Sequence, residues 1–114
     1  MSSQGPLSPA TTADDADSFG QVAWSNTNNA ISSNDSYATV SVGAGITPSD
    51  YLKLTNFSFS IPVGVTILGI VVEIEKKASS STGIKDDRVR IVKNGAYSTT
   101  DKANASTWPT SDAY

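Results

Sequence analysis

Two glutamates, Glu73 and Glu75, are the residues whose type and spacing could do chemistry in this chain. They are its only glutamates and stand two positions apart in the run VVEIEKK. Side chains two apart on a β-strand point to the same face, which would put their Cβ atoms roughly 6–7 Å apart. This separation is close to that of the paired carboxyl groups of a glycosidase, where one carboxyl group acts as the acid.

The charges that follow the glutamates favour a structural role instead. If residues 61–93 form one hairpin closed by the loop 78–85, four oppositely charged pairs face each other: Glu73 with Arg90, Glu75 with Arg88, Lys76 with Asp87, and Lys77 with Asp86. A shift of one residue would place apolar side chains opposite charged ones. Exposed pairs of this kind contribute about 1 kcal/mol or less each. We therefore expect them to fix the register, and we expect no catalytic residue here.

A second acidic group, DDADSFG at residues 14–20, could hold a cation. A calcium loop takes its oxygen ligands at defined spacings and ends on a bidentate glutamate. No glutamate follows this run at such a spacing. We expect a solvated turn or a contact with a partner, and neither a metal nor another cofactor.

The composition argues against several classes of function. The chain has no histidine and no cysteine, which removes the usual general base and the thiolate nucleophile. The net charge of −3 and the lack of a lysine and arginine cluster argue against nucleic-acid binding. The longest apolar run, 63–72, contains two glycines and a threonine and is too short to span a membrane. We do not expect an enzyme or a membrane protein.

The aromatic residues leave two interpretations open. Two tryptophans, Trp24 and Trp108, and four tyrosines could form a sugar-stacking surface on a β-sandwich. Nothing in their spacing fixes them on one face, so packing in the core and at the edges is the preferred interpretation.

The elements that would position these side chains are strands. Ser, Thr and Asn make up about a third of the 114 residues, which suits strands and turns and weakens helices. Alternation predicts strands at 21–24, 37–42 and 51–61, followed by the hairpin, and Asn94-Gly95 is a strong turn signal. The apolar set changes parity near Thr55 and Asn56, which predicts a bulge or twist there. Residues 1–20 contain little that is apolar and predict an extended arm rather than a packed element.

Five motifs resemble a family of tailed-bacteriophage virion proteins and related prophage proteins. They are G-P-x-S-P followed by an aspartate pair (5–15), A-W-S-N (23–26), I-P-x-G-x-T-I-x-G-I (61–70), V-E-I-E (72–75) and D-x-R-V-R (86–90). The motifs are spread over nearly the whole chain. They are turn and strand signatures and contain no catalytic fingerprint.

The resemblance implies an all-β fold, a jelly-roll-like antiparallel β-sandwich at 21–114 preceded by the extended N-terminal arm at 1–20. Five or six strands are few for a sandwich. Relatives commonly continue with further strands past the position of Tyr114. We therefore expect either that such strands complete the sandwich or that a partner supplies the missing edge.

The resemblance also implies a function. The favoured one is a non-enzymatic capsid decoration (cement) protein, made in the host cytoplasm and bound to the outer capsid surface of the virion. Its expected partners are the major capsid protein or other virion subunits, and it is expected to form a dimer or trimer. The residues expected to contact a partner lie in the arm: Gly5, Pro6, Leu7, Pro9, Asp14, Asp15 and Phe19. The alternative is a tail-fibre or carbohydrate-binding module that contacts the host surface.

Overall fold

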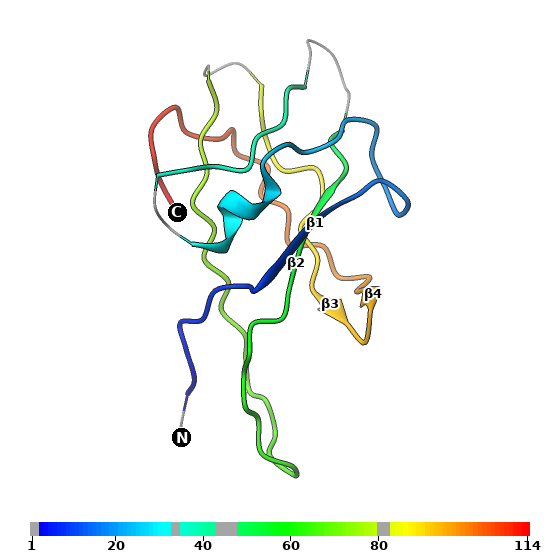
Figure 1. The fold of residues 1–114 in the computed structure, drawn as a ribbon, viewed down its shortest axis with the longest axis vertical. Helices are drawn as coiled ribbons and strands as arrows, with labels where there is room; N and C mark the ends of the chain where they lie inside the picture. Colours follow the sequence, from blue (N-terminus) through cyan, green and yellow to red (C-terminus); the bar gives the residue numbers. More distant parts are fainter. Residues whose placement is uncertain (1–2, 33–34, 43–47, 80–82) are drawn as a thin grey trace. The chain divides into compact units, whose positions relative to one another are not determined.

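The computed structural model describes residues 3–32, 35–42, 48–79 and 83–114 (Figure 1). The chain divides into two compact units, unit 1 at Met1–Val65 and unit 2 at Thr66–Tyr114. Four short strands and one 3-10 helix, η1 at Thr27–Ile31, are the regular elements of the described part. These ranges contain no α-helix, so the prediction of a β-class chain is confirmed at this level. No helix within them is long and apolar enough to cross a membrane.

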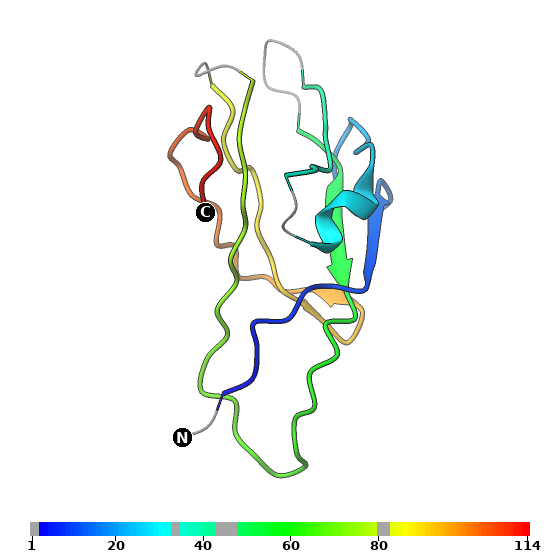
Figure 2. The same ribbon diagram turned by 60° about the vertical axis from the view of Figure 1, so that its left-hand side comes forward.

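Unit 1 is built on an antiparallel strand pair (Figures 1 and 2). Strand β1, Thr11–Asp15, pairs with β2, Tyr51–Thr55, from Thr11 opposite Thr55 to Asp15 opposite Tyr51. The structure thus differs from the predicted arm, because part of residues 1–20 is a packed strand. Its sequence, TTADD, has no apolar alternation, so the pairing is carried by backbone hydrogen bonds that a sequence pattern does not reveal.

The predicted irregularity near Thr55 and Asn56 is confirmed. β2 ends at Thr55, and both Asn56 and Ser58 have positive φ, at 61° and 60°. The backbone N–H of Ala10 reaches the carbonyl oxygens of Thr55 and Asn56 at 3.2 and 3.0 Å, so two residues face one at this point. The Asn56 amide also donates to Thr11 Oγ1 at 2.7 Å. The regular strand is therefore shorter than the predicted 51–61.

One position of unit 1, residue 20, requires glycine because the backbone of residues 49–50 lies against it. Gly20 has φ of +110°, and a Cβ placed there would lie 2.3 Å from Asp50 Cα and 2.4 Å from the carbonyl oxygen of Ser49. Both neighbours are backbone atoms that cannot swing away. Only glycine fits a position of this kind without strain.

Unit 2 contains the hairpin of β3, Val92–Lys93, and β4, Ala96–Tyr97. Asn94 and Gly95 form its two-residue turn with φ of 51° and 79°, which confirms the predicted turn and identifies it as type I′. The pairing continues outward through hydrogen bonds from Ser98 to Ile91 and from Lys102 to Val89, at 2.8 and 2.7 Å. Residues 84–93 therefore run antiparallel to residues 96–108.

This arrangement differs from the predicted 61–93 hairpin. Residue 76 pairs instead with the C-terminal segment, where Lys76 N–H donates to the carbonyl oxygen of Ala113 at 2.9 Å. Ala78 likewise donates to Pro109 at 2.8 Å. The Asn-Gly turn joins the two segments through only two residues. Residues 84–93 therefore share backbone hydrogen bonds with the segment that follows them.

Candidate interaction surface

The best-connected side chain of unit 2 is Asp86. Its Oδ1 accepts the indole N–H of Trp108 at 2.8 Å, and its Oδ2 accepts the backbone N–H of Asn104 at 3.1 Å. The ammonium group of Lys76 lies 3.2 Å from Oδ1 and 5.4 Å from the Trp108 ring centroid. Partial burial acts to raise the pKa of Asp86, but the hydrogen bonds and the Lys76 charge outweigh it, so the net pKa is lowered. The cluster ties three segments of unit 2 together.

Each of the four cations of the predicted ladder lies near a carboxylate other than its predicted partner. Lys76 pairs with Asp86, one position from its predicted partner Asp87. The C-terminal segment supplies the other carboxylates: Lys77 lies 3.4 Å from Asp112 and Arg90 lies 4.0 Å from Asp101, while Arg88 lies 3.7 Å from its neighbour Asp87. The physical reason is the pairing of residues 84–93 with the C-terminal segment, which brings new carboxylates alongside.

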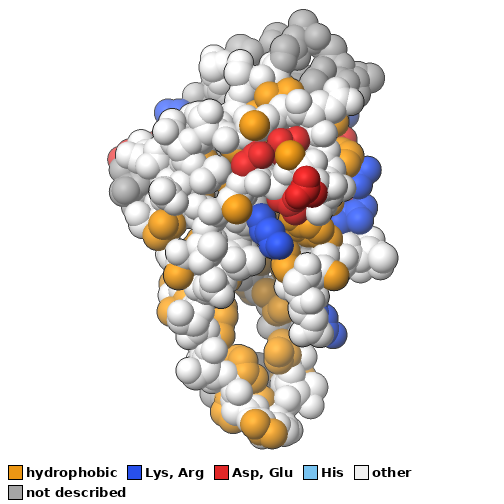
Figure 3. All heavy atoms as spheres, turned by 45° about the vertical axis from the view of Figure 1, so that its right-hand side comes forward, with side chains coloured by type: hydrophobic (Ala, Val, Ile, Leu, Met, Phe, Trp, Pro, Cys, Tyr) orange, Lys and Arg blue, Asp and Glu red, His pale blue; other side chains and the backbone are white. Residues whose placement is uncertain are grey.

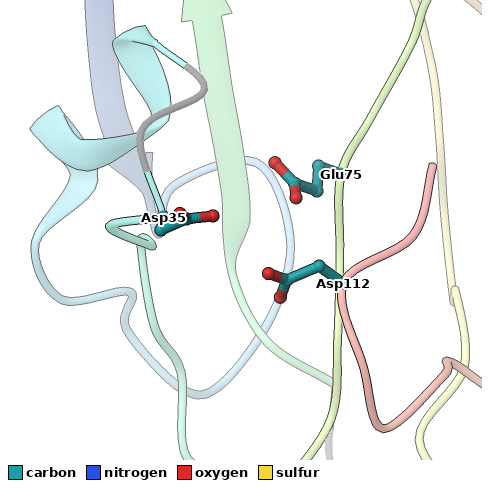
Figure 4. Close-up of side chains that lie close together, drawn as sticks. All are labelled: Asp35, Glu75 and Asp112. Carbon is teal, nitrogen blue, oxygen red and sulfur yellow. The ribbon is translucent and has the colours of Figure 1, made fainter.

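The two glutamates of the chemical hypothesis take different positions. Glu73 is exposed, whereas Glu75 is half-buried. Within unit 2, the carboxylate oxygens of Glu75 and Asp112 lie within 4.8 Å of each other. Figure 4 shows these two side chains on neighbouring segments, and it also labels Asp35, which belongs to unit 1. Two carboxylates are far from the about six to eight oxygen ligands that calcium takes.

The acidic residues of unit 1 surround a tryptophan. Asp14 Oδ1 accepts the backbone N–H of Trp24 at 2.8 Å, and the Trp24 indole donates to the carbonyl oxygen of Asp50 at the same distance. Asp50 is 6% exposed and is hydrogen-bonded to Asp14. Burial raises the pKa of Asp50, and the negative charges of Asp14 and Asp15 raise it further. Asp15 itself accepts the N–H groups of Asp17 and Ser18, as in the predicted turn.

The other residues predicted to contact a partner divide into exposed and anchored ones. Gly5, Pro6 and Leu7 are exposed, with 41% of Leu7 accessible. Pro9 is buried, and the Phe19 ring packs against Tyr51 with a centroid distance of 5.7 Å. Only the part of the predicted arm before Pro9 therefore presents an open surface.

Six large apolar side chains are exposed within one short segment of unit 2. We call residues 67–74 the apolar segment; its exposed side chains are Ile67, Leu68, Ile70, Val71, Val72 and Ile74, with exposed fractions between 45% and 89%. Adjacent residues such as Leu68 and Ile67 are both exposed, so the exposure is not confined to one side of the segment. Figure 3 shows hydrophobic side chains at the molecular surface. Monomeric proteins rarely leave so continuous an apolar run open to water.

The tryptophans do not form an open stacking surface. Both indoles are half-buried and donate their N–H to protein oxygens. The ammonium group of Lys76 lies over the Trp108 ring. A sugar that stacks on this face of Trp108 would have to displace the lysine.

Sequence reasoning missed three residues that the structure connects. Asp101 accepts the backbone N–H groups of Val89 and Ala103, which lower its pKa. Asp50 is the buried carboxylate described above. The third is Gln4, whose side chain pairs with the backbone of Ser60. All three contacts join segments through backbone groups, which leave no trace in residue patterns.

No protein-family model matches the sequence, and no curated protein or solved structure matches it significantly.

Proposed function

We propose that this chain is a non-enzymatic structural protein of a tailed-bacteriophage virion, and specifically a capsid decoration (cement) protein. The proposed complete fold is a jelly-roll-like antiparallel β-sandwich. The protein is made in the host cytoplasm, associates as a dimer or trimer and binds the outer surface of the shell through the major capsid protein or other virion subunits. The resemblance of the motifs supports this class of function.

The observation that carries the proposal is the apolar segment. A strand that is apolar on both faces reads as the interior of a sheet that is covered on both sides. Among the described residues of the chain, only Pro9, Asp50 and Ala78 are buried, and the side chains of the apolar segment are all exposed. A protein that lies between other subunits receives that cover from them. Burial of one large aliphatic side chain contributes about 1.5–3 kcal/mol, so a few such contacts give substantial binding.

Repetition on a symmetric shell adds to the effect. Many identical sites lie at fixed spacing on a capsid, so an oligomer that engages two of them gains avidity without any new contact. Each single contact then need not be tight.

The proposal is tested by sedimentation with purified capsids of the encoding phage. The double variant Leu68→Asp/Val71→Asp places charge on exposed positions, with 73% and 89% of the two side chains accessible, so the fold of the free protein should persist. Thr99→Asp changes an exposed residue elsewhere in unit 2 and is the matched control. We expect the wild type and the control to sediment with capsids and the double variant to remain in the supernatant. Wild-type protein that never sediments with capsids would refute the proposal.

The alternative glycan-binding function has less support. Both tryptophans are half-buried. The Trp24 indole donates its N–H to the carbonyl oxygen of Asp50, and the Trp108 indole donates its N–H to the carboxylate of Asp86. A glycan array with the same protein distinguishes the two functions, because only the alternative expects signals.

A further inference from the structure

The side chain of Gln4 pairs with both backbone polar groups of one residue. The N–H of Ser60 donates to Gln4 Oε1 at 2.9 Å, and Gln4 Nε2 donates to the carbonyl oxygen of Ser60. A primary amide carries a donor and an acceptor side by side, as a peptide group does. Gln4 therefore gives Ser60 the two hydrogen bonds that a residue on an adjacent antiparallel strand would give.

This contact continues the β1–β2 pair past the point where its ladder ends. The backbone of Ala10 still reaches Thr55 and Asn56, but the positive φ values of Asn56 and Ser58 interrupt the strand. Gln4 restores pairing at Ser60. Residues 4–10 thus lie along the backbone edge that follows β2, in antiparallel order, within unit 1.

The contact between Gln4 and Ser60 is weakly held and can open. Residues 3–8 are exposed, and both hydrogen bonds to Gln4 are exposed to water. Besides them, Gly5 lies against the Phe59 ring, where an added Cβ would be 3.6 Å from Cε1. Pro9 is buried and Ala10 is hydrogen-bonded, so the chain is anchored from Pro9 onward. Residues 4–8 therefore form a short exposed segment, which we call the strap, attached to the rest of unit 1 at Pro9.

We propose that residues 4–8 form a releasable strap. The hydrogen bonds between Gln4 and Ser60 hold the strap against its own protein, and the strap is released when the protein binds a capsid. The inference rests on the proposed function, in which the same residues contact neighbouring subunits. The closed strap is autoinhibitory, because the arm cannot lie on its own edge and on a subunit at the same time. Ligand binding must displace the strap, which reduces the apparent affinity by the closed-to-open ratio.

The size of the effect follows from the two hydrogen bonds. A net contribution of about 0.5–1.5 kcal/mol from an intramolecular hydrogen bond corresponds to about two- to tenfold in an equilibrium constant. Gln4→Ala removes the two hydrogen bonds and leaves the rest of the strap unchanged. We therefore expect Gln4→Ala to bind capsids several-fold more tightly than the wild type. Gln21→Ala, another exposed glutamine, is the matched control and should bind as the wild type does.

Two measurements test the strap. The first is the amide exchange rate of Ser60 in the free protein, which should rise several-fold in Gln4→Ala and stay unchanged in Gln21→Ala; an equal rate in all three proteins would overturn the inference. The second is capsid affinity. Gln4→Ala that binds no more tightly than the wild type overturns the strap but leaves the decoration function standing. The absence of capsid binding by every protein overturns the decoration function, while the exchange rate still decides whether the strap closes.

Discussion

The replacement of Asp86 is the sharpest test of how unit 2 is held together. Its carboxylate has a side-chain exposure of 9% and accepts three donors: the Trp108 indole at 2.8 Å, the Asn104 backbone at 3.1 Å and the Lys76 ammonium at 3.2 Å. Asp86→Ala removes the acceptor from all three. Donors left without a partner cost about 1–3 kcal/mol each when they stay dry.

The magnitude follows from which donors can reach water. Lys76 is 23% exposed and can be rehydrated, so its loss contributes little. Trp108 is half-buried, and Asn104 is exposed, so about one donor stays unsatisfied. We expect Asp86→Ala to lower the free energy of unfolding by about 1–3 kcal/mol. Asp86→Asn keeps an acceptor for the indole and should lose about half as much.

The assay is urea denaturation followed by tryptophan fluorescence, with Asp87→Ala as the control at the exposed neighbouring aspartate. The lowered pKa of Asp86 adds a pH test. Because the folded pKa of Asp86 lies below its unfolded pKa of 3.8, its stabilisation is present above pH 3.8 and is lost as pH falls through the folded pKa. Asp86→Asn should remove this part of the acid sensitivity. A change of less than about 0.5 kcal/mol in Asp86→Ala would refute the reasoning.

Three further outcomes are expected from single substitutions. Gly20→Ala should lower the free energy of unfolding by about 2–6 kcal/mol, since backbone strain and overlap with Asp50 each cost about 1–3 kcal/mol; thermal denaturation measures it, and an unchanged melting temperature would contradict the described approach. Gly95→Ala should cost about 1–2 kcal/mol, because alanine disfavours the φ of 79° in the type I′ turn; an unchanged free energy of unfolding in urea denaturation would argue against this turn. Asp50 has a raised pKa, so the folded state binds more protons than the unfolded state above pH 3.8, and stability should fall as pH rises through that range; Asp50→Asn should flatten this dependence, and an equal slope in both proteins would contradict the raised pKa of Asp50.

The local features of the fold were predictable because they depend on a few adjacent residues. Asn94-Gly95 specifies a turn through residues that tolerate positive φ, and the parity change around Thr55 and Asn56 marks the end of β2. The β-class of the chain followed from its composition. In each case the signal and the structure lie within a few positions of one another.

The features that sequence reasoning did not find depend on distant segments. β1 has four polar residues and one alanine, and its partner lies about forty positions away, so no apolar periodicity predicts the pairing. The charges at 86–90 complement those at 73–77, and the sequence alone cannot show that the C-terminal carboxylates Asp101 and Asp112 compete for them. Gln4 carries no pattern at all, since any exposed glutamine looks the same.

In the proposed complex, the apolar segment is covered by capsid subunits. Hydrogen exchange by mass spectrometry measures this directly, on the free protein and on the same protein bound to capsids. We expect peptides from residues 67–74 to exchange rapidly in the free protein and to become protected on the capsid, together with residues 4–8. Capsid binding that leaves the apolar segment unprotected would contradict the account.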